Sequence, residues 1–242
     1  MIIVLDAGHT EGANSRNNPY YSEGTQMFNF SKILGEILVK LGHKVIYTRD
    51  SIRSNPTLSD RCAKGSGADL FLSLHSDWAG DKNQVLVFDQ TDSKLADPKL
   101  AMAFGDALSK YWNCSFRTVY RTYNDNWLAE PRSGSVPYFG VLRGNKARKS
   151  MLIELFNHRN ADATTKFLNV SVQTDIAKLL ASVIQAHYKL NHSVGPSQPK
   201  NDNAGTLYRV VSGSYQSKEK AKERVDELRK LGQSSWILEV RD

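Results

Sequence analysis

The sequence predicts an α/β protein, in which a twisted, mostly parallel sheet is flanked by helices on both faces and a small βαβ unit follows at the C-terminal end. One observation is that short, almost wholly apolar runs alternate with stretches whose apolar residues recur every three or four positions. Strands that are separated by helices form mostly parallel sheets. Such strands are buried on both sides, which explains their continuous apolar character.

The first part of the chain is expected to contain five strands and three helices. The strands are IIVLD, KVIYTR, DLFLSLH, QVLVFD and SMLIEL, in this order along the chain. The helices span Phe30 to Leu41, Pro98 to Tyr111 and Val172 to Tyr188, where apolar residues follow helical spacing. Gly42 comes directly after the first of them, which is a common place for a helix to end.

The pattern divides the chain into a large domain over residues 1–190, a linker over 191–206 and a small unit over 207–242. The linker contains HSVGPSQPKNDNAG, which has no helical or strand periodicity. The small unit reads as a strand (LYRVVSG), a helix and a second strand (SSWILEV). Ser217 stands where the N-cap of that helix is expected.

Composition and charge exclude some classes of protein and leave others open. The 242 residues are 40% hydrophobic and 24% charged, which is typical of a soluble globular protein. No apolar run reaches the ~20 residues of a membrane span. Met1 leads directly into IIVL without the pattern of a signal peptide, so we expect cytoplasmic synthesis and, for action outside the cell, another route of release.

The net charge of +7 favours an anionic partner, but nucleic acid, membrane surfaces and acidic wall polymers all qualify. A nucleic-acid partner is not expected, because no stripe of Lys and Arg with interleaved aromatic residues stands out in the sequence. Cys62 and Cys114 lack metal-binding or redox spacing, so both are interpreted as reduced structural residues.

Residues able to bind or serve a metal follow three of the predicted strands. His9 and His75 each come at or just beyond the end of a strand, and Glu154 lies in a third. The carboxyl ends of parallel strands meet at one edge of a sheet, so these side chains should lie close together. Two histidines and one carboxylate form a catalytic zinc (Zn²⁺) site that keeps one position open. Glu23 is the preferred third ligand and Glu11 the second candidate.

Glu154 is expected to act separately, as the group that takes a proton from the attacking water and passes it to the leaving nitrogen. The alternative is a salt bridge to Arg143 or Arg159, because an unpaired buried carboxylate is costly. For His9 and His75 the alternative is an ordinary hydrogen-bonded turn residue.

Three other histidines, His43, His158 and His187, stand elsewhere in the first 190 residues. His158 follows the Glu154 strand closely, and we expect it, with the neighbouring Asn157, to contact substrate. His43 and His187 are interpreted as surface residues.

Five ordered segments resemble the zinc-dependent N-acetylmuramoyl-L-alanine amidases of the Amidase_3 type, over essentially residues 1–190. These are VLDAGHT, Glu23 before a helix, VIYTRD, ADLFLSLHSD and MLIELFNHRNADATTKFL. The resemblance implies hydrolysis of the amide bond between N-acetylmuramic acid and L-alanine of the peptidoglycan stem peptide. It also implies zinc bound by His9, Glu23 and His75, with Glu154 as the catalytic glutamate.

The chain departs from this family's usual pattern at three places. Thr10 and Glu11 stand where glycines usually follow the first histidine, Ser76 and Asp77 follow the second, and Phe156 replaces a common glycine. None of these changes removes an expected ligand. Asp6 matches the family and is expected to order the loop or orient a ligand rather than bind zinc.

The C-terminal unit resembles half of a sporulation-related (SPOR) repeat, a module that binds peptidoglycan. A unit below ~40 residues rarely folds alone, so we expect two such tails to pair and form a homodimer, which light scattering would test. Tyr208, Tyr215 and Trp236 would stack on glycan, or alternatively form the core of the unit.

Together these features predict a zinc-dependent peptidoglycan hydrolase that acts on the cell wall after release, preferably a phage endolysin causing host lysis. The other possibilities are a mother-cell autolysin freed during sporulation, a zinc peptidase acting on the stem peptide, and a wall-binding protein without turnover.

Overall fold

The computed structural model describes residues 1–15, 20–190 and 217–230. Its strands are β1 (Ile2–Ala7), β2 (Lys44–Tyr47), β3 (Leu70–Asp77), β4 (Gln84–Phe88), β5 (Ser115–Arg121), β6 (Trp127–Leu128) and β7 (Lys149–Asn157). Its helices are α1 (Glu23–Lys40), α2 (Leu58–Lys64), α3 (Pro98–Trp112), α4 (Gly140–Arg143), α5 (Ala161–Phe167), α6 (Val170–His187) and α7 (Lys218–Lys230).

The strands form one mixed sheet in the order β2-β1-β3-β7-β4-β5-β6, which confirms the predicted fold class. β2, β1, β3 and β7 are parallel neighbours, as are β4 and β5. β4 runs antiparallel to β7, and β6 runs antiparallel to β5. The reversal at β4 has a local cause, because the connection from β3, residues 78–83, is too short for a crossover to a parallel strand.

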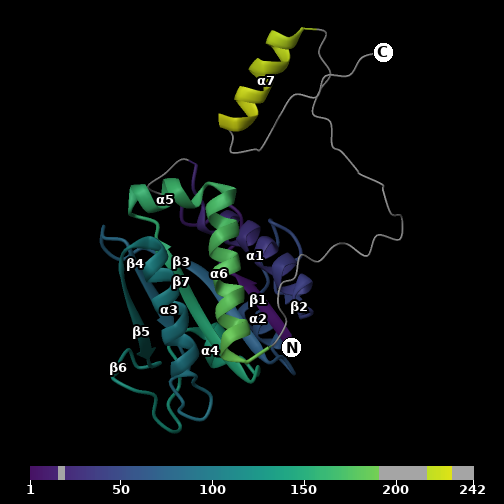
Figure 1. The fold of residues 1–242 in the computed structure, drawn as a ribbon. Helices are drawn as coiled ribbons and strands as arrows, with labels where there is room; N and C mark the ends of the chain where they lie inside the picture. The colour runs from purple at the N-terminus through teal and green to yellow at the C-terminus, as the bar shows by residue number, and fades with distance from the viewer. Residues whose placement is uncertain (16–19, 191–216, 231–242) are drawn as a thin grey trace.

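Helices cover the two faces of the sheet unequally. On one face α1, α3 and α6 pack together over the larger hydrophobic cluster, and Figure 1 shows α3 and α6 lying across the front of the sheet. The smaller cluster on the other face includes Val141 and Leu142 of α4, which also contacts α2. His75 and Glu154 alternate with residues of the larger cluster along their strands, so they lie on the face of α2 and α4.

Several element boundaries differ from those expected from the sequence. The first helix begins at Glu23 instead of Phe30, because the Ser22 side chain caps the helix by accepting a hydrogen bond from the Thr25 backbone N–H. The short helix α2 was not predicted, because seven residues show little apolar periodicity, although Thr57 and Asp60 form a capping box at its start. β5 was also missed, since polar residues interrupt its apolar pattern.

Two histidines were expected at the surface, and for His43 this was wrong. His43 is buried, and its Nε2 lies 3.0 Å from Oε1 of Gln185 on α6. The His187 side chain is partly buried, and its Nε2 lies 3.0 Å from Oδ2 of Asp97. Cys62 and Cys114 are free cysteines, as expected.

The C-terminal unit is described only over α7, where a helix was predicted. The Ser217 Oγ accepts a hydrogen bond from the backbone N–H of Lys220 at 3.4 Å, so Ser217 caps the helix as expected. The predicted linker and the two flanking strands lie outside the described residues. Within the described part of the chain no single helix is long and apolar enough to span a membrane, and α5 with α6 meets that test only as a pair bent by 87°.

Candidate metal centre

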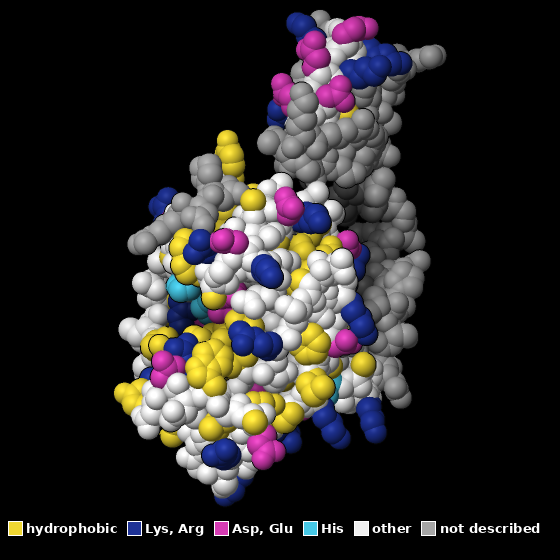
Figure 2. Space-filling model, turned by 90° about the vertical axis from the view of Figure 1, so that its left-hand side faces the viewer, with side chains coloured by type: hydrophobic (Ala, Val, Ile, Leu, Met, Phe, Trp, Pro, Cys, Tyr) yellow, Lys and Arg dark blue, Asp and Glu magenta, His cyan; other side chains and the backbone are white. Residues whose placement is uncertain are grey.

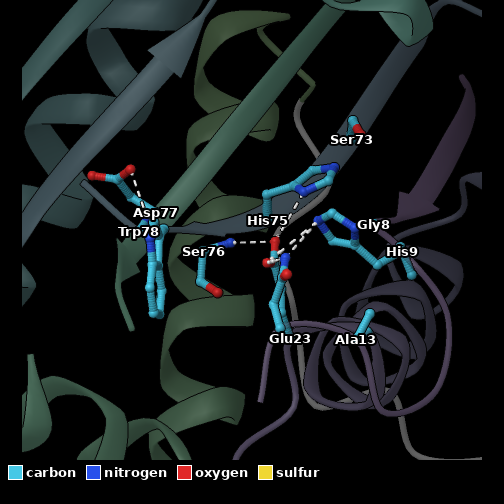
Figure 3. Close-up of polar contacts among 12 residues, drawn as sticks. Gly8, His9, Ala13, Glu23, Ser73, His75, Ser76, Asp77 and Trp78 are labelled. Carbon is cyan, nitrogen blue, oxygen red and sulfur yellow. Dashed lines mark hydrogen bonds and ion pairs between the residues drawn. The ribbon is translucent and has the colours of Figure 1, made fainter. Parts of the chain in front are cut away.

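Three side chains that are distant in the sequence meet at the edge of the sheet where β1 and β3 end. His9 follows β1, Glu23 is the first residue of α1, and His75 lies near the end of β3. Figure 3 shows the Glu23 carboxylate between the two imidazoles. His9 Nε2 lies 3.3 Å from one carboxylate oxygen and His75 Nδ1 lies 2.9 Å from the other.

The geometry of this cluster fits a single metal ion. One ligand atom from each of the three residues lies within 4.8 Å of the other two. Two ligands of a tetrahedral zinc ion, each at roughly 2.0–2.1 Å from the metal, stand about 3.3 Å apart. Two nitrogens and one carboxylate oxygen are also the donor set of open, catalytic zinc sites. Glu11, the other candidate ligand, is exposed and bonds instead to Arg53 at 3.2 Å.

Two glycines allow the three ligands to approach one another. A Cβ on Gly8 would lie 2.3 Å from Cε1 of His75, and a Cβ on Gly24 would lie 1.7 Å from the backbone oxygen of Thr10. His9 itself has a φ of 59°, a left-handed conformation that few non-glycine residues adopt. The turn after β1 is therefore shaped for the site at some conformational cost.

The charges of the cluster favour an ionised carboxylate. Burial by itself would raise the pKa of Glu23, but hydrogen bonds with His75 and His9 outweigh it and hold that pKa well below its usual range. The same hydrogen bond with Glu23 raises the pKa of His9. The Asn14 side-chain amide also converges on the site, donating to Glu23 Oε2 at 2.7 Å and lying 3.2 Å from His9 Nε2.

Glu154 lies beside the cluster on the neighbouring strand. It is the register partner of His75, so the two side chains project from the same face of the sheet. Its Oε2 is buried and has no hydrogen-bond partner among the described residues. Burial, followed by the negative charges of Glu23 and Asp77, raises the pKa of Glu154 well above its usual value.

The salt bridge considered as an alternative for Glu154 is absent from the described contacts of both arginines. Arg143 donates to the backbone oxygens of Pro137 and Tyr138. Arg159 pairs with Asp81 at 2.9 Å. A buried carboxylate without a cationic partner is costly to stability, which favours a functional reason for its presence.

Two buried arginines that sequence reasoning missed hold the loops of the site. Arg61 of α2 donates to Asp6 Oδ1 and to the backbone oxygens of Ala7 and His9, at 2.8, 2.7 and 2.8 Å. Arg49, in the VIYTRD segment, donates to the backbone oxygen of Gly24 at 2.8 Å. The signal that could have found Arg61 is Asp6, a carboxylate in an apolar strand that requires a buried donor.

Asp6 does not belong to the metal cluster. Its carboxylate accepts hydrogen bonds from the hydroxyls of Thr48 and Ser73, both at 2.6 Å, in addition to the bond from Arg61. This arrangement agrees with the expected ordering role, because it ties the end of β1 to β3 and α2.

The residues expected to contact substrate differ in their surroundings. Asn157 is fully buried, and its Nδ2 donates to the backbone oxygens of Ala79, Gly80 and Lys82, so the amide holds the loop after β3. His158 is also buried, its Nδ1 bonds to Ser76, and its Nε2 has no partner among the described residues. These contacts favour a structural role for Asn157 and leave a polar nitrogen of His158 beside the site.

The departures from the family pattern have structural explanations. The Ser76 backbone N–H donates to Glu23 Oε1 at 3.1 Å, and its hydroxyl bonds to Tyr21. The Asp77 carboxylate accepts hydrogen bonds from the backbone N–H groups of Trp78 and Ala79, the first of which is drawn in Figure 3. Phe156 is fully buried in the larger hydrophobic cluster.

Comparison with protein-family models shows which family the chain belongs to. The model described as N-acetylmuramoyl-L-alanine amidase (Amidase_3) matches residues 3–186, most of the chain. The chain belongs to this family. It is therefore an enzyme, a peptidoglycan amidase, as its resemblance to the family predicted. A model of the SPOR domain matches residues 170–239, so it overlaps the amidase match along α6, which packs against α1 and α3.

Solved structures of other amidases share the fold. The CwlD amidase from Clostridioides difficile, solved in complex with the GerS lipoprotein, is 22% identical with a TM-score of 0.60, over 78% of this chain and 99% of that one. The catalytic domain of CwlV from Bacillus (Paenibacillus) polymyxa var. colistinus is 21% identical with a TM-score of 0.55, over 78% and 98%. The catalytic domain of the CD27L endolysin, which targets Clostridia difficile, is 21% identical with a TM-score of 0.57, over 77% and 97%. No curated protein matches the chain.

Proposed function

We propose that this amidase is zinc-dependent and that it hydrolyses the bond between N-acetylmuramic acid and L-alanine of the stem peptide. The observation that carries the proposal is the cluster of His9, Glu23 and His75, whose three ligand atoms fit one tetrahedral ion. A bound zinc ion supplies a Lewis acid that polarises the scissile carbonyl and lowers the pKa of a water molecule.

In this proposal Glu154 moves the proton. Its Oε2, which has no hydrogen-bond partner among the described residues, accepts a proton from the attacking water and then passes it to the departing nitrogen of L-alanine. The strand β7 holds the carboxyl group in register with His75, so the distance between acid and metal ligand is fixed by the sheet. Burial and the nearby charges of Glu23 and Asp77 raise the pKa of Glu154 above that of an exposed glutamate, which strengthens its carboxylate as a proton acceptor.

The test separates metal binding from proton transfer. The Glu154→Gln variant should keep its zinc, by metal analysis, and lose at least about 100-fold in kcat, because a proton shuttle contributes ~10²–10⁴-fold. His75→Ala should lose zinc and activity together. Glu36→Gln, the same change at an exposed position on α1, serves as the matched control and should retain both.

Product analysis identifies the bond that is cut. Mass spectrometry of digested peptidoglycan should show intact stem peptides with a new L-alanine amino terminus. Fragments cut within the stem peptide would indicate the zinc peptidase instead. Full activity of Glu154→Gln would refute the proposed role of that residue.

We also propose that the amidase is a phage endolysin that lyses its host from within. The fold that it shares with the CD27L endolysin catalytic domain supports this role. A mother-cell autolysin of the same activity is the second candidate, which the match to the SPOR domain favours. Lysis on coexpression with a phage holin, and none without it, is the result expected of the endolysin.

The C-terminal unit is proposed to bind the wall, supported by the SPOR match. The division into residues 1–190, 191–206 and 207–242 is likewise part of this proposal. Tyr208, Tyr215 and Trp236, which were predicted to stack on glycan, lie outside the described residues. The pairing of two tails into a homodimer also stays a prediction.

A further inference from the structure

An exposed surface on the β5–β6 side of the sheet combines arginines with aromatic rings. This arginine–aromatic surface consists of Arg117, Arg121, Tyr123, Trp127, Tyr138 and Arg143. The Arg121 guanidinium lies 3.7 Å from the ring centre of Tyr138 and 5.3 Å from that of Trp127. Arg117 lies 6.0 Å from Trp127, and Arg143 lies 4.6 Å from Tyr123. Trp127 and Tyr123 are 55% and 62% exposed, so the surface is open to a ligand.

One residue of this surface, Arg117, shares a row of the sheet with residues of the catalytic site. His75 pairs with Glu154, Glu154 pairs with Leu86, and Leu86 pairs with Arg117, so the four residues form one row on the same face. Neighbouring strands are ~4.8 Å apart, which places the backbone of Arg117 about 14 Å from that of His75. Figure 2 shows hydrophobic and basic side chains beside the hollow in which histidine side chains lie.

We propose that the arginine–aromatic surface binds the distal carboxylates of the stem peptide, which rests on the proposed function above. An extended peptide advances ~3.3 Å per residue, so about four residues separate the cleaved amide bond from the row position of Arg117. Stem peptides carry free carboxylates along this stretch and at their carboxyl end. Stacked guanidinium groups are held in place to bind carboxylates through two hydrogen bonds.

The charges on the surface support a carboxylate as the occupant. The Asp125 carboxylate already accepts a hydrogen bond from Arg121 at 2.6 Å, which shows that a carboxylate fits beside the stacked rings. Arg117 is exposed and has no carboxylate partner among the described residues. Arginines among aromatic rings also suit single-stranded nucleic acid, but the shared row with Glu154 favours the substrate of that site.

The experiment uses the full-length, zinc-loaded enzyme and three soluble substrates. These are a muramoyl-tetrapeptide with free carboxylates, the same compound with its carboxylates amidated, and muramoyl-L-alanine. The preference is defined as the kcat/KM for the muramoyl-tetrapeptide with free carboxylates, divided by the kcat/KM for the amidated compound or for muramoyl-L-alanine. Arg117→Gln should lower this preference about tenfold, mainly through KM, because one charge-assisted contact is lost. Arg117→Lys should retain part of the preference.

Lys110→Gln is the matched control, since Lys110 is an exposed cation on α3 that pairs with Asp106 away from this surface. It should leave the preference unchanged. An unchanged preference in Arg117→Gln would overturn the inference, as would an equal loss on all three substrates. Loss of oligonucleotide binding in Arg117→Gln with an unaltered preference would assign the surface to nucleic acid instead. If the wild-type enzyme cleaved none of the substrates, the proposed function itself would fail.

Discussion

The buried pair of Arg61 and Asp6 offers the sharpest test of how the site is held. Arg61 is 5% exposed and Asp6 is fully buried, and their side chains meet at 2.8 Å. Arg61→Met keeps most of the apolar volume while it removes the charge and every donor. The variant leaves the Asp6 carboxylate without its cation and the backbone oxygens of Ala7 and His9 without their donor.

Removing one partner of a buried, hydrogen-bonded ion pair costs about 3–5 kcal/mol of the free energy of unfolding. We expect a loss of this size for Arg61→Met. The loop that carries His9 also loses its anchor, so zinc affinity should fall about 10–100-fold, as for other groups that orient ligands. Urea unfolding of the metal-free protein and competition with a zinc chelator measure the two effects separately.

A double-mutant cycle with Asp6→Asn isolates the pair. The combined variant should be destabilised by clearly less than the sum of the single variants, because the second change removes the charge that the first left unpaired. Arg148→Met is the control, since Arg148 is exposed and lies 3.5 Å from Asp69; its effect should be a small fraction of that at Arg61. The reasoning is refuted if Arg61→Met costs less than about 1 kcal/mol or if the two changes are additive.

Two further predictions concern the turn before His9 and a buried carboxylate remote from the site. Gly8→Ala should displace the His75 ring, which a Cβ would approach to 2.3 Å, and so lower zinc affinity at least about tenfold by chelator competition; unchanged affinity would contradict the close approach. Burial raises the pKa of Asp89 to about 7, although the backbone N–H groups of Gln90 and Asp97 donate to it. The folded state then holds the proton more tightly, so wild-type stability should fall relative to Asp89→Asn as pH rises from about 4 to 7, by at most ~1.4 kcal/mol per unit. Urea unfolding of both proteins across this pH range measures the effect. A difference in the free energy of unfolding that does not change with pH would contradict the raised pKa of Asp89.

Much of the fold could be predicted because burial leaves a local trace in the sequence. A strand such as β1 is buried on both faces, so all of its residues except Asp6 are apolar. Segments whose structure depends on contacts with distant parts of the chain show no such local apolar pattern. β5 is partly exposed and polar, and the pairing of β4 with β7 instead of β3 is set by how distant strands pack.

The sequence by itself determined that two histidines and a glutamate stand in or just after three strands, because an apolar run marks a buried strand and its end locally. Only the tertiary structure decided how Glu23 reaches both histidines, which guanidinium groups hold the loops, and where Arg117 lies relative to Glu154. The reason is physical. Apolar periodicity records whether a segment is buried, whereas the partner of a polar group is set by chain segments far away in sequence, through packing that no local pattern encodes.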